Sequence, residues 1–146
     1  MATAKLGRML TPWQLRSHRR FERNFHMLLD VAANQRNVTP NRWMSFERLS
    51  VYFRVSYRVL VPVKTVEEAM ARRVRCIDIA NVSTDERYQH QGMFTRLVDK
   101  VHASTDMPIY LENTQIEFAN HLLANHGWKF HRDNGGYSYD LIHYRC

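Results

Sequence analysis

Cysteine is scarce in this sequence, and its placement excludes one common class of site. The only two cysteines are Cys76 and Cys146, and neither has another cysteine at a spacing typical of metal ligands. The eight histidines are scattered along the chain, so we predict no zinc site. Two isolated cysteines suit a protein of a reducing compartment.

Long apolar runs are also missing. No stretch approaches the roughly 18 residues that a membrane helix needs, and the N-terminus lacks the apolar core of a signal peptide. We therefore expect no membrane association and a cytoplasmic location. There is no repeat or low-complexity segment, and a content of 45% hydrophobic and 12% aromatic residues excludes a disordered chain.

The sequence does contain enough apolar residues for one domain, together with a marked positive charge. A chain of 146 residues can bury a full core. We predict a single domain over residues 1–146, with residues 1–10 as a loose N-terminal arm. The formal net charge of +7 favours an anionic cofactor, a nucleic acid or an acidic protein partner.

Residues 74–101 predict a strand, a polar loop and an amphipathic helix. The strand, Val74–Val82, is apolar on both faces except at Asp78, as in the middle of a sheet. The apolar residues of the helix recur at i, i+3, i+4 and i+7, at Phe94, Leu97, Val98 and Val101. Gly92 lets the backbone approach a ligand, and the first helix amides have no partner within the helix. Such a helix start can bind an anion, most simply a diphosphate.

The N-terminal third predicts a long helix. Thr11, Pro12 and Gln14 form a helix opening with a capping box, and the helix should run to about Gln35. Its buried stripe is expected at Trp13, Phe21, Phe25, Leu28, Leu29 and Ala32.

The remaining elements alternate between helix and strand. Thr39-Pro40 predicts the start of a short helix through Trp43 and Phe46. Alternating apolar residues over 49–62 predict a strand, either one piece or a hairpin. A capped helical turn follows over 65–73, then a strand over 109–113 and a helix over 116–125. Residues 133–136 predict a hairpin turn between strands at 128–132 and 137–144.

One face of the first helix is basic. Its four arginines, at i, i+3, i+4 and i+7, are Arg16, Arg19, Arg20 and Arg23. This face is either ordinary solvated surface or a docking surface for an acidic target or a phosphate backbone. No aromatic residues alternate with the arginines there, so we predict no base-stacking platform.

Two segments together suggest a family. Gln89-His90-Gln91-Gly92 matches the first four places of the loop pattern Arg/Gln-x-x-Gly-x-Gly/Ala, while Phe94 departs from the small residue of the sixth place. Downstream, a strand ends in Leu111-Glu112-Asn113, and a helix follows that ends before Gly127-Trp128. In this order and spacing, the segments resemble the GNAT superfamily of acetyl-CoA-dependent N-acetyltransferases. The residues Leu-Glu-Asn before this helix and Gly-Trp after it are most similar to those of small acetyltransferase-like proteins encoded by bacteriophages.

The resemblance implies a fold and a cofactor. The fold is α/β: a GNAT-type mixed central sheet with a splayed parallel strand pair, Val74–Val82 and Ile109–Asn113, flanked by helices. Acetyl-CoA would place its pantetheine arm in the splay and its pyrophosphate on the loop. The implied cofactor-binding residues are Ala80, Asn81, Val82, Gln89, Gln91, Gly92, Met93, Phe94, Thr95 and Asn113.

The implied reaction is direct attack by an amine on the acetyl thioester. The amine must lose a proton to a base. Glu112 is the first candidate, although it could equally pair with one of the arginines. Asp78 is the second candidate, although a buried structural role suits it better. A backbone amide near Asn81 or Val82 would stabilise the carbonyl oxygen.

The acid that protonates the departing thiolate is missing from its usual place. The family often has a tyrosine in the helix after Asn113, and that position falls on Leu123. Tyr88 or Tyr110 could replace it, although aromatic residues in such strands more often belong to the core.

Three functions remain open at this point. The first is an N-acetyltransferase acting on an amine, with a host protein as its partner in the host cytoplasm if the chain is phage-encoded. The second is a GNAT-fold binding module that inhibits a host factor and has weak or no catalysis, which Leu123 and Phe94 favour. The third is acetylation of aminoacyl-tRNA, which the basic charge permits. A homodimer is compatible with each.

Overall fold

The structure is a computed structural model that describes residues 9–85 and 92–145. Its helices are α2 (Pro12–Asn34), α3 (Val66–Arg72), α4 (Met93–Ser104) and α5 (Ile116–Asn125). Its strands are β1 (Asn41–Phe46), β2 (Leu49–Arg58), β3 (Val74–Ser83), β4 (Ile109–Gln115), β5 (Lys129–Asp133) and β6 (Ser138–His143). No helix within these described ranges is long and apolar enough to cross a membrane.

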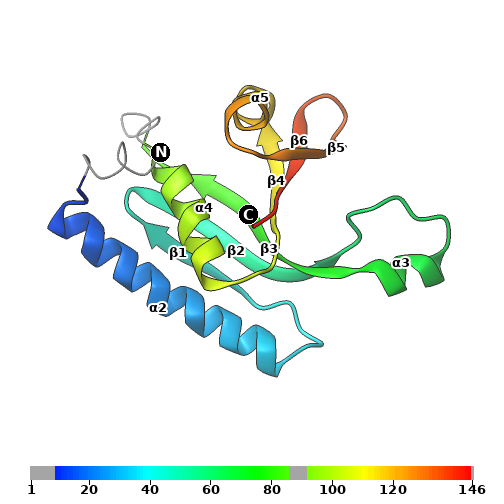
Figure 1. The fold of residues 1–146 in the computed structure, drawn as a ribbon, viewed down its shortest axis with the longest axis horizontal. Helices are drawn as coiled ribbons and strands as arrows, with labels where there is room; N and C mark the ends of the chain where they lie inside the picture. The colour runs from blue at the N-terminus through cyan, green and yellow to red at the C-terminus, as the bar shows by residue number, and fades with distance from the viewer. Residues whose placement is uncertain (1–8, 86–91, 146) are drawn as a thin grey trace.

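The strands form one six-stranded mixed sheet in the order β1-β2-β3-β4-β6-β5. β3 and β4 are parallel, and the other neighbouring pairs are antiparallel. This α/β architecture confirms the predicted fold class and is consistent with a GNAT-like fold. Figure 1 shows β3 and β4 diverging at their arrowheads, with α4 and α5 beside them.

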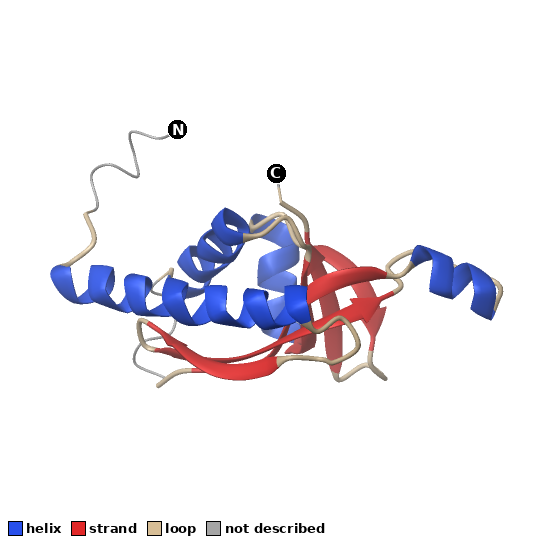
Figure 2. Ribbon diagram, turned by 90° about the horizontal axis from the view of Figure 1, so that it is seen from below, coloured by secondary structure: helices blue, strands red, loops and turns tan. Residues whose placement is uncertain are grey.

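The core lies on one face of the sheet. Phe21 and Phe25 of α2, Leu97 of α4 and Leu122 of α5 pack into the same buried cluster as Phe53 of β2. Figure 2 shows the long helix α2 lying along one face of the sheet, with α3 projecting beyond the end of the sheet. A smaller buried cluster lies on the opposite face of the sheet and consists of Cys76, Tyr110 and Ile142, with the partly buried Leu60 against it.

The long helix forms as its first turn predicts. Thr11 Oγ1 accepts a hydrogen bond from the Gln14 amide at 3.1 Å, and Gln14 Oε1 accepts one from the Thr11 amide at 2.9 Å. Phe21, Phe25, Leu28 and Ala32 face the core, as expected. Trp13 does not, because it lies at the helix end and is 37% exposed. His18 is buried instead.

The expected short helix after residue 39 is wrong, because residues 41–46 form edge strand β1. Met44 and Phe46 are buried while Trp43 and Ser45 are exposed, which is the two-residue period of a strand. β1 pairs along its whole length with β2, and β2 is a single piece rather than a hairpin. The pairing partner decides the conformation of such a short apolar segment.

Candidate functional site

The site predicted from the sequence lies where β3 and β4 part. Only three residue pairs join the two strands, from Ile77 with Ile109 to Ile79 with Leu111. β3 then continues to Ser83 and β4 to Gln115 without pairing to each other. We call this region the fork. It opens at the carboxyl ends of two parallel strands, which is where α/β sheets bind ligands.

A β-bulge helps to open the fork. Tyr52 of β2 pairs with Asn81 and the next residue, Phe53, pairs with Ile79, so Ala80 is left over. Such an extra residue bends its strand and increases its twist. Residues 80–82 therefore leave the line of β4: Asn81 and Val82 pair with β2 alone, and Ala80 has a pairing partner on neither neighbouring strand.

Helix α4 begins with a left-handed glycine. Gly92 is its N-cap with φ 73°, and no side chain caps the helix in the described part of the chain. Any other residue would be strained at this φ. The Met93, Phe94 and Thr95 amides are first-turn donors, and such donors are the feature on which the sequence-based prediction of an anion site rests. Tyr88, Gln89 and Gln91 lie outside the described residues.

Arg96 is a residue at this helix start that the sequence pattern did not single out. Its Nε and Nη2 donate to the Glu47 carboxylate at 2.7 and 2.6 Å. Its remaining nitrogen, Nη1, would lie 3.2 Å from a Cβ atom at Gly92. A guanidinium therefore sits directly beside the glycine of the loop. Arg96 and Glu47 are 49 residues apart in the sequence, and no sequence motif joins them.

Glu47 anchors this arrangement from the turn between β1 and β2. It has φ 53° and is buried, and it also bonds His18 Nε2 at 2.7 Å. Burial by itself raises the pKa of Glu47, but the hydrogen bonds from Arg96 and His18 outweigh burial and lower it below its ordinary value. The ionised carboxylate thus ties α2, the β1–β2 turn and α4 together.

The two candidate bases lie together on the face of the sheet opposite the main core. Glu112 accepts hydrogen bonds from the guanidinium groups of both Arg54 and Arg58. The alternative that Glu112 pairs with arginines is therefore what its contacts show. A carboxylate held by two guanidiniums can accept an amine proton only in competition with those donors.

Asp78 is more completely enclosed. Its side chain is 1% exposed, it accepts from Arg58 Nε at 2.9 Å and from Ser56 Oγ at 2.5 Å, and its neighbours on the strand face the core. These are the contacts of a buried structural partner. Asp78 and Glu112 share Arg58, which joins β2, β3 and β4 below the fork.

Asn113 and Tyr110 are held by the C-terminal hairpin. Asn113 has φ 51° in the irregular part of β4, and its amide donates to Asp140 Oδ1 at 2.9 Å. Tyr110 donates its hydroxyl to Asp140 Oδ2 at 2.6 Å and is 2% exposed. Burial, with the bond to Asp140, raises the pKa of Tyr110. Its proton is thus committed to Asp140 rather than available to a thiolate.

Phe94 occupies the space between the helices that flank the fork. Its ring centroid lies 5.3 Å from that of Phe118 on α5 and 5.9 Å from that of Trp128. Leu123 is half-buried against the same core. A small residue in place of Phe94 would leave the start of α4 more open. The Phe94 ring therefore fills space beside the start of α4.

The four arginines of the basic face are all exposed, so the expected shared face exists. None forms an ion pair or hydrogen bond with another described residue. Within residues 9–85 and 92–145, no group of three or more His, Cys, Asp or Glu side chains could hold a metal ion.

Comparisons with known proteins add no relative to this geometry. No family model, no curated protein and no solved structure matches the chain.

Proposed function

We propose that the protein is a GNAT-type N-acetyltransferase that binds acetyl-CoA in the fork and acetylates an amine of a protein. The observation that carries this proposal is the fork itself. The pairing of β3 and β4 ends after three residue pairs, and the helix that follows β3 starts with a left-handed glycine and no side-chain cap. An unpaired strand edge and free helix amides are the two features that a phosphate-bearing, amide-containing arm requires.

The pantetheine arm and the pyrophosphate of the cofactor would each face a complementary backbone segment. Ala80, Asn81 and Val82 would bind the pantetheine amides as an added strand does. The amides of Gly92, Met93, Phe94 and Thr95 would bind the pyrophosphate, with the Thr95 hydroxyl as a further donor. The Nη1 atom of Arg96 beside Gly92 favours the same negative charge.

In the transfer step, the amine nitrogen would attack the thioester carbonyl carbon. The C–N bond would form and the C–S bond would break, and the coenzyme thiolate would then take a proton from solvent, which balances the proton that the amine loses. An amide near Asn81 or Val82 would stabilise the charge on the carbonyl oxygen. Glu112 would take the amine proton directly or through a water molecule, provided that Arg54 or Arg58 moves off one of its oxygens.

Ligand-induced stabilisation tests the binding part of this proposal. Acetyl-CoA at a hundred times its Kd should add about 2.7 kcal/mol to the free energy of unfolding. For a domain of this size that is a rise in Tm of about 5 to 10 °C. Gly92→Ala should abolish most of this rise, because it strains the loop at φ 73°.

Gly136→Ala is the matched control. Gly136 has φ 83° in the β5–β6 turn, with no atom within 4 Å of its Cβ position. Gly136→Ala should lower the basal Tm about as much as Gly92→Ala does, while keeping the rise in Tm with acetyl-CoA. Absence of any rise in the unaltered protein would end the cofactor proposal.

A binding module without catalysis is the second candidate, and two observations favour it. Phe94 packs against Phe118 and Trp128 at the start of α4, and both candidate bases are held by arginines. Incubation of the protein with host lysate and labelled acetyl-CoA, compared with lysate and label alone, separates these functions. Label on protein supports the acetyltransferase, label on tRNA supports the aminoacyl-tRNA reaction, and absence of label from both supports the module.

A further inference from the structure

The outer face of α2 is a second surface that suggests a function, at a distance from the fork. Arg16, Arg19, Arg20 and Arg23 are exposed and lie opposite the stripe that packs on the sheet. The four span about 10.5 Å along the helix, at 1.5 Å per residue. Their guanidinium groups have no carboxylate partner among the described residues.

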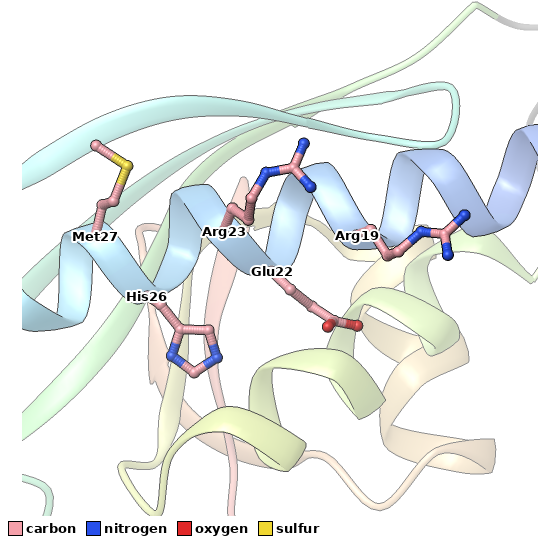
Figure 3. Close-up of a pocket in the computed structure, with 5 residues that line it drawn as sticks. All are labelled: Arg19, Glu22, Arg23, His26 and Met27. Carbon is pink, nitrogen blue, oxygen red and sulfur yellow. The ribbon is translucent and has the colours of Figure 1, made fainter.

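The neighbouring acidic residues do not neutralise this face. Glu22 projects toward α4 (Figure 3), where its Oε1 lies 2.7 Å from Lys100 Nζ. Asp30 is exposed, but it lies about two turns beyond Arg23. Arg16 with Arg20 and Arg19 with Arg23 are like-charge pairs at i, i+4, which oppose helix formation. The arginines therefore cost the isolated helix stability, and a partner of opposite charge would reverse that cost.

Exposed apolar side chains continue the same face. Met27 is 53% exposed and Val31 is 40% exposed, and Met27 follows Arg20 by two turns. Figure 3 shows Arg23 and Met27 on the side of α2 that points away from α4, with Arg19 at the other end of a pocket along the helix. Arginine, methionine and aromatic residues are enriched in protein interfaces. A phosphate backbone is charged and offers these apolar side chains no apolar surface to pack against.

A stacking platform for bases is also missing from this face. Trp13 is the exposed aromatic residue of α2, and the Arg48 guanidinium covers its ring at 4.4 Å. Nucleic acid would therefore be held only by the phosphates. A protein segment would use the arginines and the apolar residues together.

We propose that the outer face of α2 docks an acidic amphipathic helix of a protein partner. Carboxylates one turn apart on that helix would accept paired (bidentate) hydrogen bonds from the guanidinium groups of Arg16, Arg19, Arg20 and Arg23. Its apolar stripe would cover Met27 and Val31. This inference is independent of the proposed acetyl transfer, since an enzyme and an inhibitory module would both need such a surface to hold a protein target.

A synthetic peptide tests the proposal. The probe is a labelled helix of about 20 residues, long enough to be helical in water, with glutamates at i, i+3, i+4 and i+7 beside a leucine stripe. A scrambled peptide of the same composition and a DNA duplex of equal charge serve as competitors. Fluorescence anisotropy at several salt concentrations gives the affinities.

The variants separate a specific surface from bulk charge. Arg19→Glu with Arg23→Glu should weaken binding of the amphipathic peptide at least about tenfold, or about 1.4 kcal/mol. Arg42→Glu with Arg72→Glu, on β1 and α3, makes the same change in net charge and should have less than about a twofold effect. Met27→Ser should weaken the binding that remains at high salt.

Three outcomes would overturn the inference. They are equal weakening by both double variants, equal binding of the scrambled peptide, and tighter binding of the duplex that is lost in the α2 variant. A single cooperative thermal transition with the basal Tm of the unaltered protein shows that the α2 variant is folded. Because this control needs no cofactor, failure of docking stays distinct from failure of the cofactor site.

Discussion

At the scale of single residues, Glu112 can be tested for stability and catalysis separately. Glu112→Gln removes the charge that faces Arg54 and Arg58. Because these side chains are partly exposed, the free energy of unfolding should fall by only about 1 to 2 kcal/mol. If Glu112 is the base, the rate of acetyl transfer should fall about a hundredfold or more, while the Tm rise with acetyl-CoA stays.

Glu67→Gln on the exposed first turn of α3 is the control for this change. It should alter neither the urea midpoint nor the rate by much. A Glu112→Gln protein that transfers acetyl groups at the normal rate would assign Glu112 to the ion-pair network alone.

Glu47 gives a prediction about pH. Its pKa in the folded protein lies below the ordinary value of 4.5, so its contribution to stability is fully present above that pH. The contribution is lost as the pH falls through the lower folded value. At neutral pH, Glu47→Gln should cost about 3 kcal/mol, because Arg96 loses its buried partner.

Urea denaturation of both proteins at several pH values measures this difference. The gap in free energy of unfolding should be widest at neutral pH and should narrow below pH 4.5. A gap that stays constant down to low pH would show that the geometry of the turn, rather than the charge of Glu47, stabilises the fold.

At the scale of elements, the sequence predicted those whose signal is local. α2 and α4 have apolar residues at helical spacing over several turns, and the capping box of Thr11 fixes where α2 starts. β1 has only six residues, and Thr39-Pro40 before it imitates a helix start. Its conformation depends on pairing with β2, which a local pattern does not reveal.

The same distinction applies to the candidate site. The glycine at the start of α4 could be placed from the strand–loop–helix pattern, and the fork was expected from the resemblance to the acetyltransferases. The contacts of the side chains could not, because Arg54 and Glu112 are 58 residues apart and Arg96 and Glu47 are 49 apart. Whether a carboxylate in the fork faces an arginine or open space depends on strand order and register, which the residues near it do not encode.

The junction of α4 and α5 yields a prediction at this scale. Phe94→Ala should destabilise the protein by about 2 kcal/mol, because a half-buried ring is lost from Phe118 and Trp128. It also restores a small residue at the start of α4. We therefore expect a lower basal Tm and a larger rise in Tm with acetyl-CoA.

Phe118→Ala is the matched variant on the facing helix. It should show a comparable loss of basal Tm and a smaller effect on the ligand-induced rise, because it leaves the Phe94 ring in place. If Phe94→Ala binds acetyl-CoA less tightly than the unaltered protein, the ring supports the cofactor site rather than narrowing it.

At the scale of the whole molecule, the sheet consists of two halves with few connections. β1–β3 and β4–β6 are joined by three residue pairs between β3 and β4. The arginine–carboxylate network reinforces this seam on the face opposite the main core. On the core face, Nε2 of His102 on α4 lies 2.8 Å from Nδ1 of His143 on β6. A ligand in the fork would bridge both halves at the point where the strands no longer do.

Hydrogen exchange can detect this bridging. Without ligand, amides of residues 80–83 and of the first turn of α4 should exchange faster than those of 77–79, because fewer of them have a partner in the sheet or helix. Acetyl-CoA should slow exchange in these two segments. Exchange in β1, which lies two strands away from the fork, should change little. Uniform slowing across all strands would indicate global stabilisation by a ligand bound elsewhere, and slowing confined to α2 would place the anion on the basic face instead of in the fork.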